Sequence, residues 1–163
     1  MTIESDAPRV LVSLATYNEK DNLRPLIEEI FKYVPHAHIL VVDDNSPDGT
    51  GKLADEMAEQ NPQIHVIHRE GKLGLGTATM RAMRYAMDED YDLHVNMDAD
   101  FSHHPRYLPA MLAGMERYDV MIGSRYVPGG GTENWPWKRK FISTSVNILS
   151  PFLLRLRPHD TTA

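Results

Sequence analysis

Short apolar runs alternate along the chain with longer stretches whose apolar residues recur every three or four positions. The runs are rich in branched side chains and end in polar residues, as buried parallel strands do. They cover residues 10–15, 38–44, 64–68, 92–97 and 119–123. The longer stretches have the spacing of one helix face. They cover residues 23–34, 51–60, 77–87 and a segment opened by Pro105. This order predicts an α/β fold: a doubly wound, mostly parallel sheet with helices on both faces and right-handed crossovers.

Two of the predicted helix starts carry recognisable signals. Asn22 is a candidate N-cap, and Pro25 would then fall in the first turn, where no intrahelical N–H bond is lost. His103 and His104 precede Pro105, which suits the first position of a helix. Because adjacent side chains diverge, both histidines can hardly reach one metal ion. A helix-entry role is therefore favoured over a zinc site for this pair.

Polar segments follow four of the predicted strands. They are TYNE (16–19), DDNSPDG (43–49), DADFS (98–102) and GSRY (123–126). The carboxyl ends of parallel strands meet at one edge of a sheet, and ligands of open α/β sheets bind beyond that edge. The four segments therefore predict a single site for a nucleotide-like ligand that spans several strand ends.

Asp98 and Asp100 are the strongest candidates for metal ligands. In an extended backbone, residues i and i+2 point to the same side, so both carboxylates would converge on one cation. Oxygen ligands in a chain without cysteine suit Mg²⁺ or Mn²⁺ rather than structural zinc. Such a cation would neutralise a pyrophosphate leaving group. A solvated turn is the competing explanation of the two aspartates, and the shared edge favours the functional one.

Composition excludes several other functions. The formal net charge of −6 argues against nucleic-acid binding, which needs a basic surface. The absence of cysteine excludes disulfides, thiolate metal sites and cysteine nucleophiles, and it is compatible with a reducing cytoplasm. The N-terminus lacks the layout of a signal peptide, and no apolar run reaches the length of a transmembrane helix. We therefore expect a soluble or peripheral membrane protein.

Two further segments carry weaker signals. Gly71, Gly74 and Gly76 match neither the dinucleotide fingerprint nor the P-loop, and phosphate contact and close helix–sheet packing explain them equally well. Residues 134–157 combine two Trp residues, three consecutive cations and an apolar helical pattern. That composition is typical of a membrane-interface helix. A core-packing helix with a basic first turn is the alternative, although cations at a helix N-terminus oppose the helix dipole.

Several motifs taken together resemble one family. They are TYNEKDNL, VVDDNSPDGT, the segment from Arg69 to Ala78, MDADFSHHP, GSRYVPGGG and WKRKFIS. In this order they resemble the family 2 glycosyltransferases of GT-A fold, and within them the dolichyl-phosphate (polyprenyl-phosphate) mannosyltransferases. The resemblance extends from about Arg9 to Asp160. It implies one catalytic domain over residues 1–163, truncated at its C-terminal end relative to the family.

The resemblance also implies substrates and residue roles. Mannose would pass from GDP-mannose to a polyprenyl (dolichyl-type) phosphate, with Mg²⁺ or Mn²⁺ as cofactor. The residues expected around the nucleotide sugar are Ala15, Tyr17, Glu19, Val42, Asp44, Asp98, Ala99, Asp100 and Arg125. Asp98 and Asp100 would bind the metal, with Ser102 at a position where some members have a Gln ligand. Arg139 and Ser143 would bind the lipid phosphate.

The expected mechanism is direct displacement with inversion. A phosphate monoester has a second pKa of about 6, so the acceptor oxygen is already negatively charged at neutral pH. A general base is therefore not indispensable. The expected location is the cytoplasmic face of a membrane, with any membrane-anchoring subunit unidentified. Three alternatives compete with this reading. They are a UDP-glucose:polyprenyl-phosphate glucosyltransferase, a nucleotide-binding module without turnover, and a nucleotidyltransferase, which would need a glycine-rich basic loop after the first strand.

Overall fold

The computed structural model describes residues 7–127, 130–131 and 136–154, apart from the side chains of residues 139–140 and 148–154. These residues belong to two compact units, Met1–Leu112 and Ala113–Ala163. The first unit contains the sheet. The second contains one long helix.

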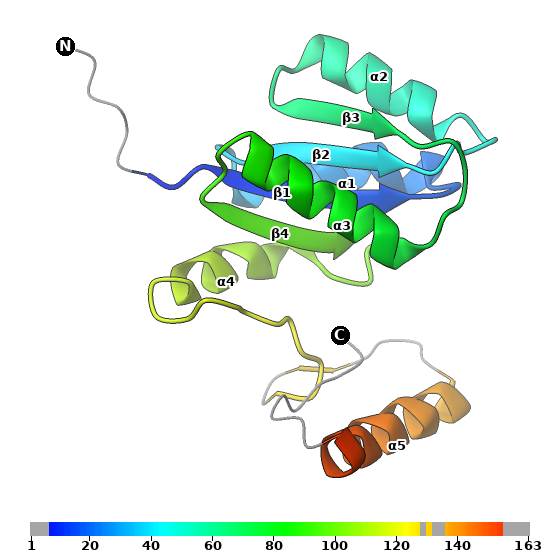
Figure 1. Cartoon of the computed structure of the whole chain (residues 1–163), viewed down its shortest axis with the longest axis vertical. Coiled ribbons are helices and arrows are strands. Elements are labelled where there is room, and N and C mark those ends of the chain that lie inside the picture. The colour runs from blue at the N-terminus through cyan, green and yellow to red at the C-terminus, as the bar shows by residue number, and fades with distance from the viewer. Residues whose placement is uncertain (1–6, 128–129, 132–135, 155–163) are drawn as a thin grey trace. The chain divides into compact units, whose positions relative to one another are not determined.

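A four-stranded parallel sheet forms the first unit (Figure 1). Its strands are β1 (Val10–Thr16), β2 (His38–Asp43), β3 (Ile64–His68) and β4 (Leu93–Asp98), in the order β3-β2-β1-β4. The chain winds outward from β1 to β3 and then crosses back to place β4 on the other side of β1. This reversal creates a topological switch point between β1 and β4, where α/β sheets bind ligands. The predicted α/β fold is confirmed.

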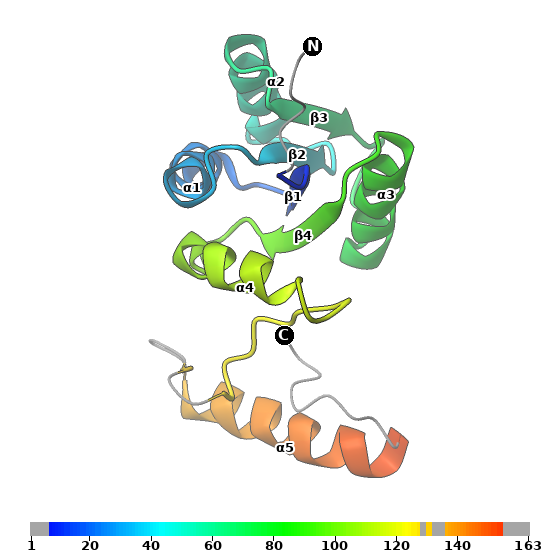
Figure 2. The ribbon, with the colours of Figure 1, turned by 90° about the vertical axis from the view of Figure 1, so that its left-hand side faces the viewer.

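Helices cover both faces of this sheet (Figure 2). On one face lie α1 (Lys20–Tyr33), α2 (Thr50–Gln60) and the short α4 (Leu108–Gly114), which a 3₁₀ turn, Pro105–Tyr107, precedes. On the other face lies α3 (Leu75–Asp88). β1 supplies both cores because its side chains alternate: Val10, Val12 and Leu14 pack under α1, and Leu11 packs under α3. Each of these four side chains is at most 1% exposed. The sheet is therefore fixed from both sides.

The helix boundaries correct one prediction and confirm another. α1 begins at Lys20 with Glu19 as its N-cap residue, so Asn22 is not the cap. The Asn22 amide instead donates to the Glu19 carboxylate over 2.8 Å, within the first turn. Pro25 consequently lies in the second turn, where an ordinary residue would donate to the Asp21 carbonyl. His104 accepts from the backbone N–H of Arg106 at 3.2 Å, which confirms its predicted helix-entry role.

One prediction is wrong in the second unit: residues 119–123 were expected to form a strand. No strand forms there, and Val120 and Ile122 are 73% and 50% exposed. An apolar run becomes a strand only when a neighbouring edge offers hydrogen bonds, and these residues pair with no strand of the described chain. α5 (Trp137–Leu154) confirms the helical pattern within the segment 134–157, of which residues 134–135 and 155–157 lie outside the described residues. Within the described residues, no helix has both the length and the apolar character needed to cross a membrane.

Candidate functional site

The strand register brings three predicted site residues to one level of the sheet. Ala15 of β1 pairs with Val42 of β2 on one side and with Asp98 of β4 on the other. Both neighbours therefore lie about 5 Å from the β1 backbone, the spacing of hydrogen-bonded strands. Three of the four predicted polar segments begin here, at the switch point. The fourth, residues 123–126, belongs to the second unit.

The loops after β1 and β2 are joined by a ladder of hydrogen bonds. The Thr16 hydroxyl donates to Asp43 over 3.0 Å, and the backbone N–H groups of Asn18, Glu19 and Lys20 donate to side chains of the 43–50 loop. The acceptors are the Ser46 hydroxyl (3.0 Å), the Thr50 hydroxyl (3.0 Å) and the Asp48 carboxylate (3.2 Å). Asn18 makes the turn possible with a left-handed φ of 63°, which asparagine tolerates better than most residues. The segment bearing Tyr17 and Glu19 is thereby held in one conformation.

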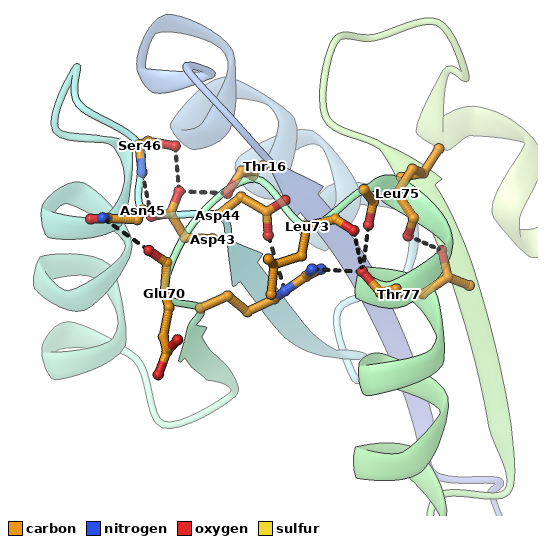
Figure 3. Close-up of polar contacts among 12 residues, drawn as sticks. Thr16, Asp43, Asp44, Asn45, Ser46, Glu70, Leu73, Leu75 and Thr77 are labelled. Carbon is orange, nitrogen blue, oxygen red and sulfur yellow. Dashed lines mark hydrogen bonds and ion pairs between the residues drawn. The ribbon is translucent and has the colours of Figure 1, made fainter.

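Asp43 and Asp44 are adjacent but have different surroundings (Figure 3). Asp43 is 2% exposed and accepts three hydrogen bonds, from the Thr16 hydroxyl and from the backbone and hydroxyl of Ser46. Asp44 forms an ion pair with Arg69, whose Nε lies 3.2 Å from Asp44 Oδ1. These two side chains are 9% and 8% exposed. The pair is close, yet Asp44 Oδ1 and Arg69 Nη1 have no hydrogen-bond partner among the described residues.

Arg69 connects the edge of the sheet to the start of α3. Its backbone N–H donates to the Asp43 carbonyl over 2.8 Å, and its Nη2 donates to the Thr77 hydroxyl over 2.6 Å. Thr77 in turn donates to the Leu73 and Gly74 carbonyls at 3.0 and 2.8 Å, at the first turn of α3 (Figure 3). The loop between β3 and α3 is therefore part of the site.

The predicted metal ligands lie where β4 ends, and one premise about them is wrong. Asp98 is the last residue of β4, and Ala99 and Asp100 form a turn, so the backbone is not extended across the three residues. Phe101 follows with a left-handed φ of 61°. The Asp98 side chain is 45% exposed, and Ala99 is buried. Asp98 stays a candidate metal ligand because it lies at the switch point.

Asp100 is held ionised by its neighbours. Partial burial opposes ionisation, but hydrogen bonds from the Ser102 side chain and backbone lower the pKa of Asp100, with a smaller contribution from His103. The Ser102 N–H lies 2.9 Å from Asp100 Oδ1. Carboxylates of this kind, from two residues that are two positions apart in the chain, are ligands that Mg²⁺ or Mn²⁺ accepts. No group of three or more potential His, Cys, Asp or Glu metal ligands occurs among the described residues, so other ligands must complete the coordination.

The histidines beside this turn are placed differently. His103 Nδ1 lies 3.9 Å from Asp98 Oδ2, at the limit of an ion pair, while His104 caps the turn that follows. They diverge, as expected for adjacent residues.

Three predicted residues belong to the second unit. Arg125 lies in a turn, and its role next to the sugar phosphate stays a prediction. Ser143 is 9% exposed, and its hydroxyl accepts from the Tyr126 hydroxyl at 2.7 Å. Arg139 lies on α5, but its side chain is outside the described residues. The proposed lipid-phosphate roles of Arg139 and Ser143 also stay predictions.

The sequence analysis assigned no role to Arg69 or Thr77, although the segment from Arg69 to Ala78 is among the motifs of the resemblance. The signal was present: REGK (69–72) follows β3 as the other polar segments follow their strands. Applying the strand-end rule to β3 as well would have placed Arg69 beside Asp44.

Comparison with known proteins identifies relatives over nearly the whole chain. The family model for glycosyl transferase family 2 matches residues 12–162. A polyprenol monophosphomannose synthase of Mycolicibacterium smegmatis is 47% identical over 95% of this chain and 59% of its own length. An undecaprenyl-phosphate mannosyltransferase of Micrococcus luteus is 44% identical over 95% of this chain and 64% of its own length. The chain thus spans about three fifths of each of these relatives.

Among solved structures, a mannosyltransferase from Pyrobaculum calidifontis in complex with GDP-Man and Mn²⁺ is similar to this chain. It is 28% identical with a TM-score of 0.51, over 59% of this chain and 28% of that one. The likeness agrees with the fold described above.

Proposed function

The chain belongs to glycosyl transferase family 2, and we propose that it transfers mannose from GDP-mannose to a polyprenyl phosphate. The observation that carries the proposal is the strand register at the switch point, which sets Ala15 between Val42 and Asp98. A nucleoside at the β1–β2 side and a diphosphate at the β4 side would fit that order. The names of the two bacterial relatives support mannose and a polyprenol-type acceptor.

The nucleoside would lie against Tyr17 and Asp44. Tyr17 is 37% exposed, and Asp44, whose buried Oδ1 lies 3.2 Å from Arg69 Nε, has acceptor positions beyond that ion pair. A carboxylate accepts from the N–H groups of guanine or from ribose hydroxyls. A uracil N–H suits it as well, so the assay below compares both nucleotides.

Asp98 and Asp100 would hold Mg²⁺ or Mn²⁺. When bound, the metal supplies charge neutralisation to the departing diphosphate. Asp98 and Asp100 would place the metal ion at the carboxyl end of β4. The backbone N–H of Ser102 keeps the Asp100 carboxylate fixed and ionised.

The acceptor would need positioning rather than deprotonation. Its phosphate oxygen attacks the anomeric carbon of mannose, the bond to GDP breaks, and the configuration inverts. Arg139 and Ser143 would steer the acceptor phosphate, and Arg125 would face the sugar phosphate of the donor. The exposed Trp137, Phe141 and Ile142 of α5 support contact with a membrane surface, which we propose to be the cytoplasmic face.

The test is a transfer assay with the full chain. The protein is incubated with labelled GDP-mannose or labelled UDP-glucose, polyprenyl phosphate and Mn²⁺, and organic-extractable label is measured. Label from GDP-mannose alone supports the proposal, and label from UDP-glucose alone overturns it. GDP binding without transfer favours a nucleotide-binding module. Asp100→Asn should abolish transfer while leaving the far-ultraviolet circular dichroism unchanged, with Lys52→Ala on α2 as a control that also removes one charge.

A further inference from the structure

The loop between β3 and α3 crosses the edge of the candidate site. We call residues 70–76, which are this loop and the first two residues of α3, the strap. Both of its ends are anchored, because Arg69 donates to the Asp43 carbonyl over 2.8 Å and to the Thr77 hydroxyl over 2.6 Å. Arg69 is itself 8% exposed and paired with Asp44. The strap is therefore a short closed loop on a fixed base.

Between its anchors, the strap makes few contacts with the rest of the site. The Asn45 amide donates to the Glu70 carbonyl at a long 3.4 Å. Lys72 Nζ lies 4.3 Å from the centre of the Tyr17 ring, a cation–π contact. Because Tyr17 lies in the loop after β1, this contact is what ties the middle of the strap to the site.

The strap is also built to move. A Cβ added at Gly71, Gly74 or Gly76 would meet nothing within 4 Å, and Leu73 and Leu75 are 62% and 58% exposed. Gly74 has a φ of +95°, which other residues adopt only with strain. Glycines in open space give the backbone freedom to change direction, and no apolar packing holds these two leucines in place.

We propose that the strap closes the nucleoside position in the free protein and is displaced when the nucleotide binds. Lys72 occupies a face of the Tyr17 ring, and a purine or pyrimidine stacked on that face takes its place. The inference rests on the proposed function, because it takes Tyr17 to lie beside the nucleoside. It adds that binding must first break the Lys72–Tyr17 contact, so the contact lowers the apparent affinity.

Removing Lys72 should therefore raise affinity for the nucleoside. Cation–π contacts at exposed sites are worth ~0.5–1 kcal/mol, which at ~1.4 kcal/mol per tenfold is about a two- to fivefold change in Kd. The experiment measures Kd by calorimetry for guanosine and for GDP with Mn²⁺, in wild type, Lys72→Ala and Lys52→Ala. Lys52 is an exposed lysine of α2, so its variant matches the change in net charge.

Guanosine separates displacement from charge attraction because it carries no phosphate. The expected result is tighter binding of both ligands by Lys72→Ala and unchanged binding by Lys52→Ala. Weaker GDP binding with unchanged guanosine binding would make Lys72 a phosphate ligand and overturn the proposal. Unchanged binding of both ligands would overturn it equally.

Hydrogen exchange of the strap amides tests the closed state without any ligand. Amides 70–76 should exchange faster in Lys72→Ala than in wild type and Lys52→Ala, and addition of GDP to wild type should also speed their exchange. Equal exchange rates of these amides in all three proteins would refute the closed strap and leave the proposed function untouched. A wild-type protein that binds neither guanosine nor GDP refutes the proposed function, and the displacement with it.

Discussion

Replacing Arg69 by Met tests whether the buried ion pair holds the site together. The substitution keeps an unbranched side chain of similar length and removes the guanidinium. Asp44 then keeps a carboxylate that is only 9% exposed and has lost its 3.2 Å partner, and Thr77 loses a donor at 2.6 Å. Breaking a buried pair in this way typically costs about 3–5 kcal/mol.

The lower end of that range applies here. Asp44 Oδ1 and Arg69 Nη1 lack a hydrogen bond among the described residues, so the native pair is not fully satisfied. We therefore expect Arg69→Met to lower the free energy of unfolding by about 3 kcal/mol. With a urea m-value of roughly 1–3 kcal/mol per M, the midpoint should fall by about 1–3 M.

The assay is urea denaturation followed by far-ultraviolet circular dichroism. Tryptophan fluorescence is the wrong probe, because both Trp residues, at positions 135 and 137, belong to the second unit. The double variant Asp44→Asn/Arg69→Met removes both charges and should recover most of the loss. A loss below about 1 kcal/mol for Arg69→Met, or single effects that add within ~0.5 kcal/mol in the double variant, would refute the reasoning.

Three other predictions follow from single contacts. Gly51→Ala should lower the free energy of unfolding by about 1–3 kcal/mol, because the added Cβ would lie 2.8 Å from an Asp43 oxygen; Gly71→Ala, with nothing within 4 Å, is the matched control in the same urea titration. Burial lowers the pKa of His94, so the unfolded chain binds its proton at a higher pH than the folded chain, and stability should fall as pH drops below about 6.5. His94→Asn should reduce this dependence of stability on pH in thermal melts, and an unchanged dependence would contradict the assignment to His94. Arg139→Ala should raise KM for polyprenyl phosphate more than for GDP-mannose, and equal effects in steady-state kinetics would argue against an acceptor role.

The sheet was predictable because parallel strands are buried on both faces. Val10, Val12 and Leu14 face one core while Leu11 faces the other, which produces a continuous apolar run rather than an alternating one. The same pattern failed at residues 119–123. An apolar run reports burial, but it carries no information on whether a neighbouring edge offers hydrogen bonds.

The site was predictable at the level of strand ends and not beyond them. Asp98 ends β4 opposite Ala15, as the strand-end rule required. Asp100 lies two residues later in a turn, where the period-two argument no longer holds. Arg69 lies 25 residues from its partner Asp44, so no pattern within one element links them; only the strand-end rule, applied to β3 as well as β2, brings them together.

The two adjacent aspartates show why chemistry at this edge depends on more than a motif. Asp43 receives three hydrogen bonds from its own loops, so a ligand could use it only by dismantling the turn that holds Tyr17. Asp44 Oδ1 lies 3.2 Å from the Arg69 guanidinium without a hydrogen bond among the described residues, and a carboxylate has about four acceptor positions. That oxygen is buried, so a ligand reaches it only if the neighbouring chain moves. Asp44 is therefore the aspartate with acceptor capacity left for a ligand, whereas the acceptor positions of Asp43 are used to hold the two loops together.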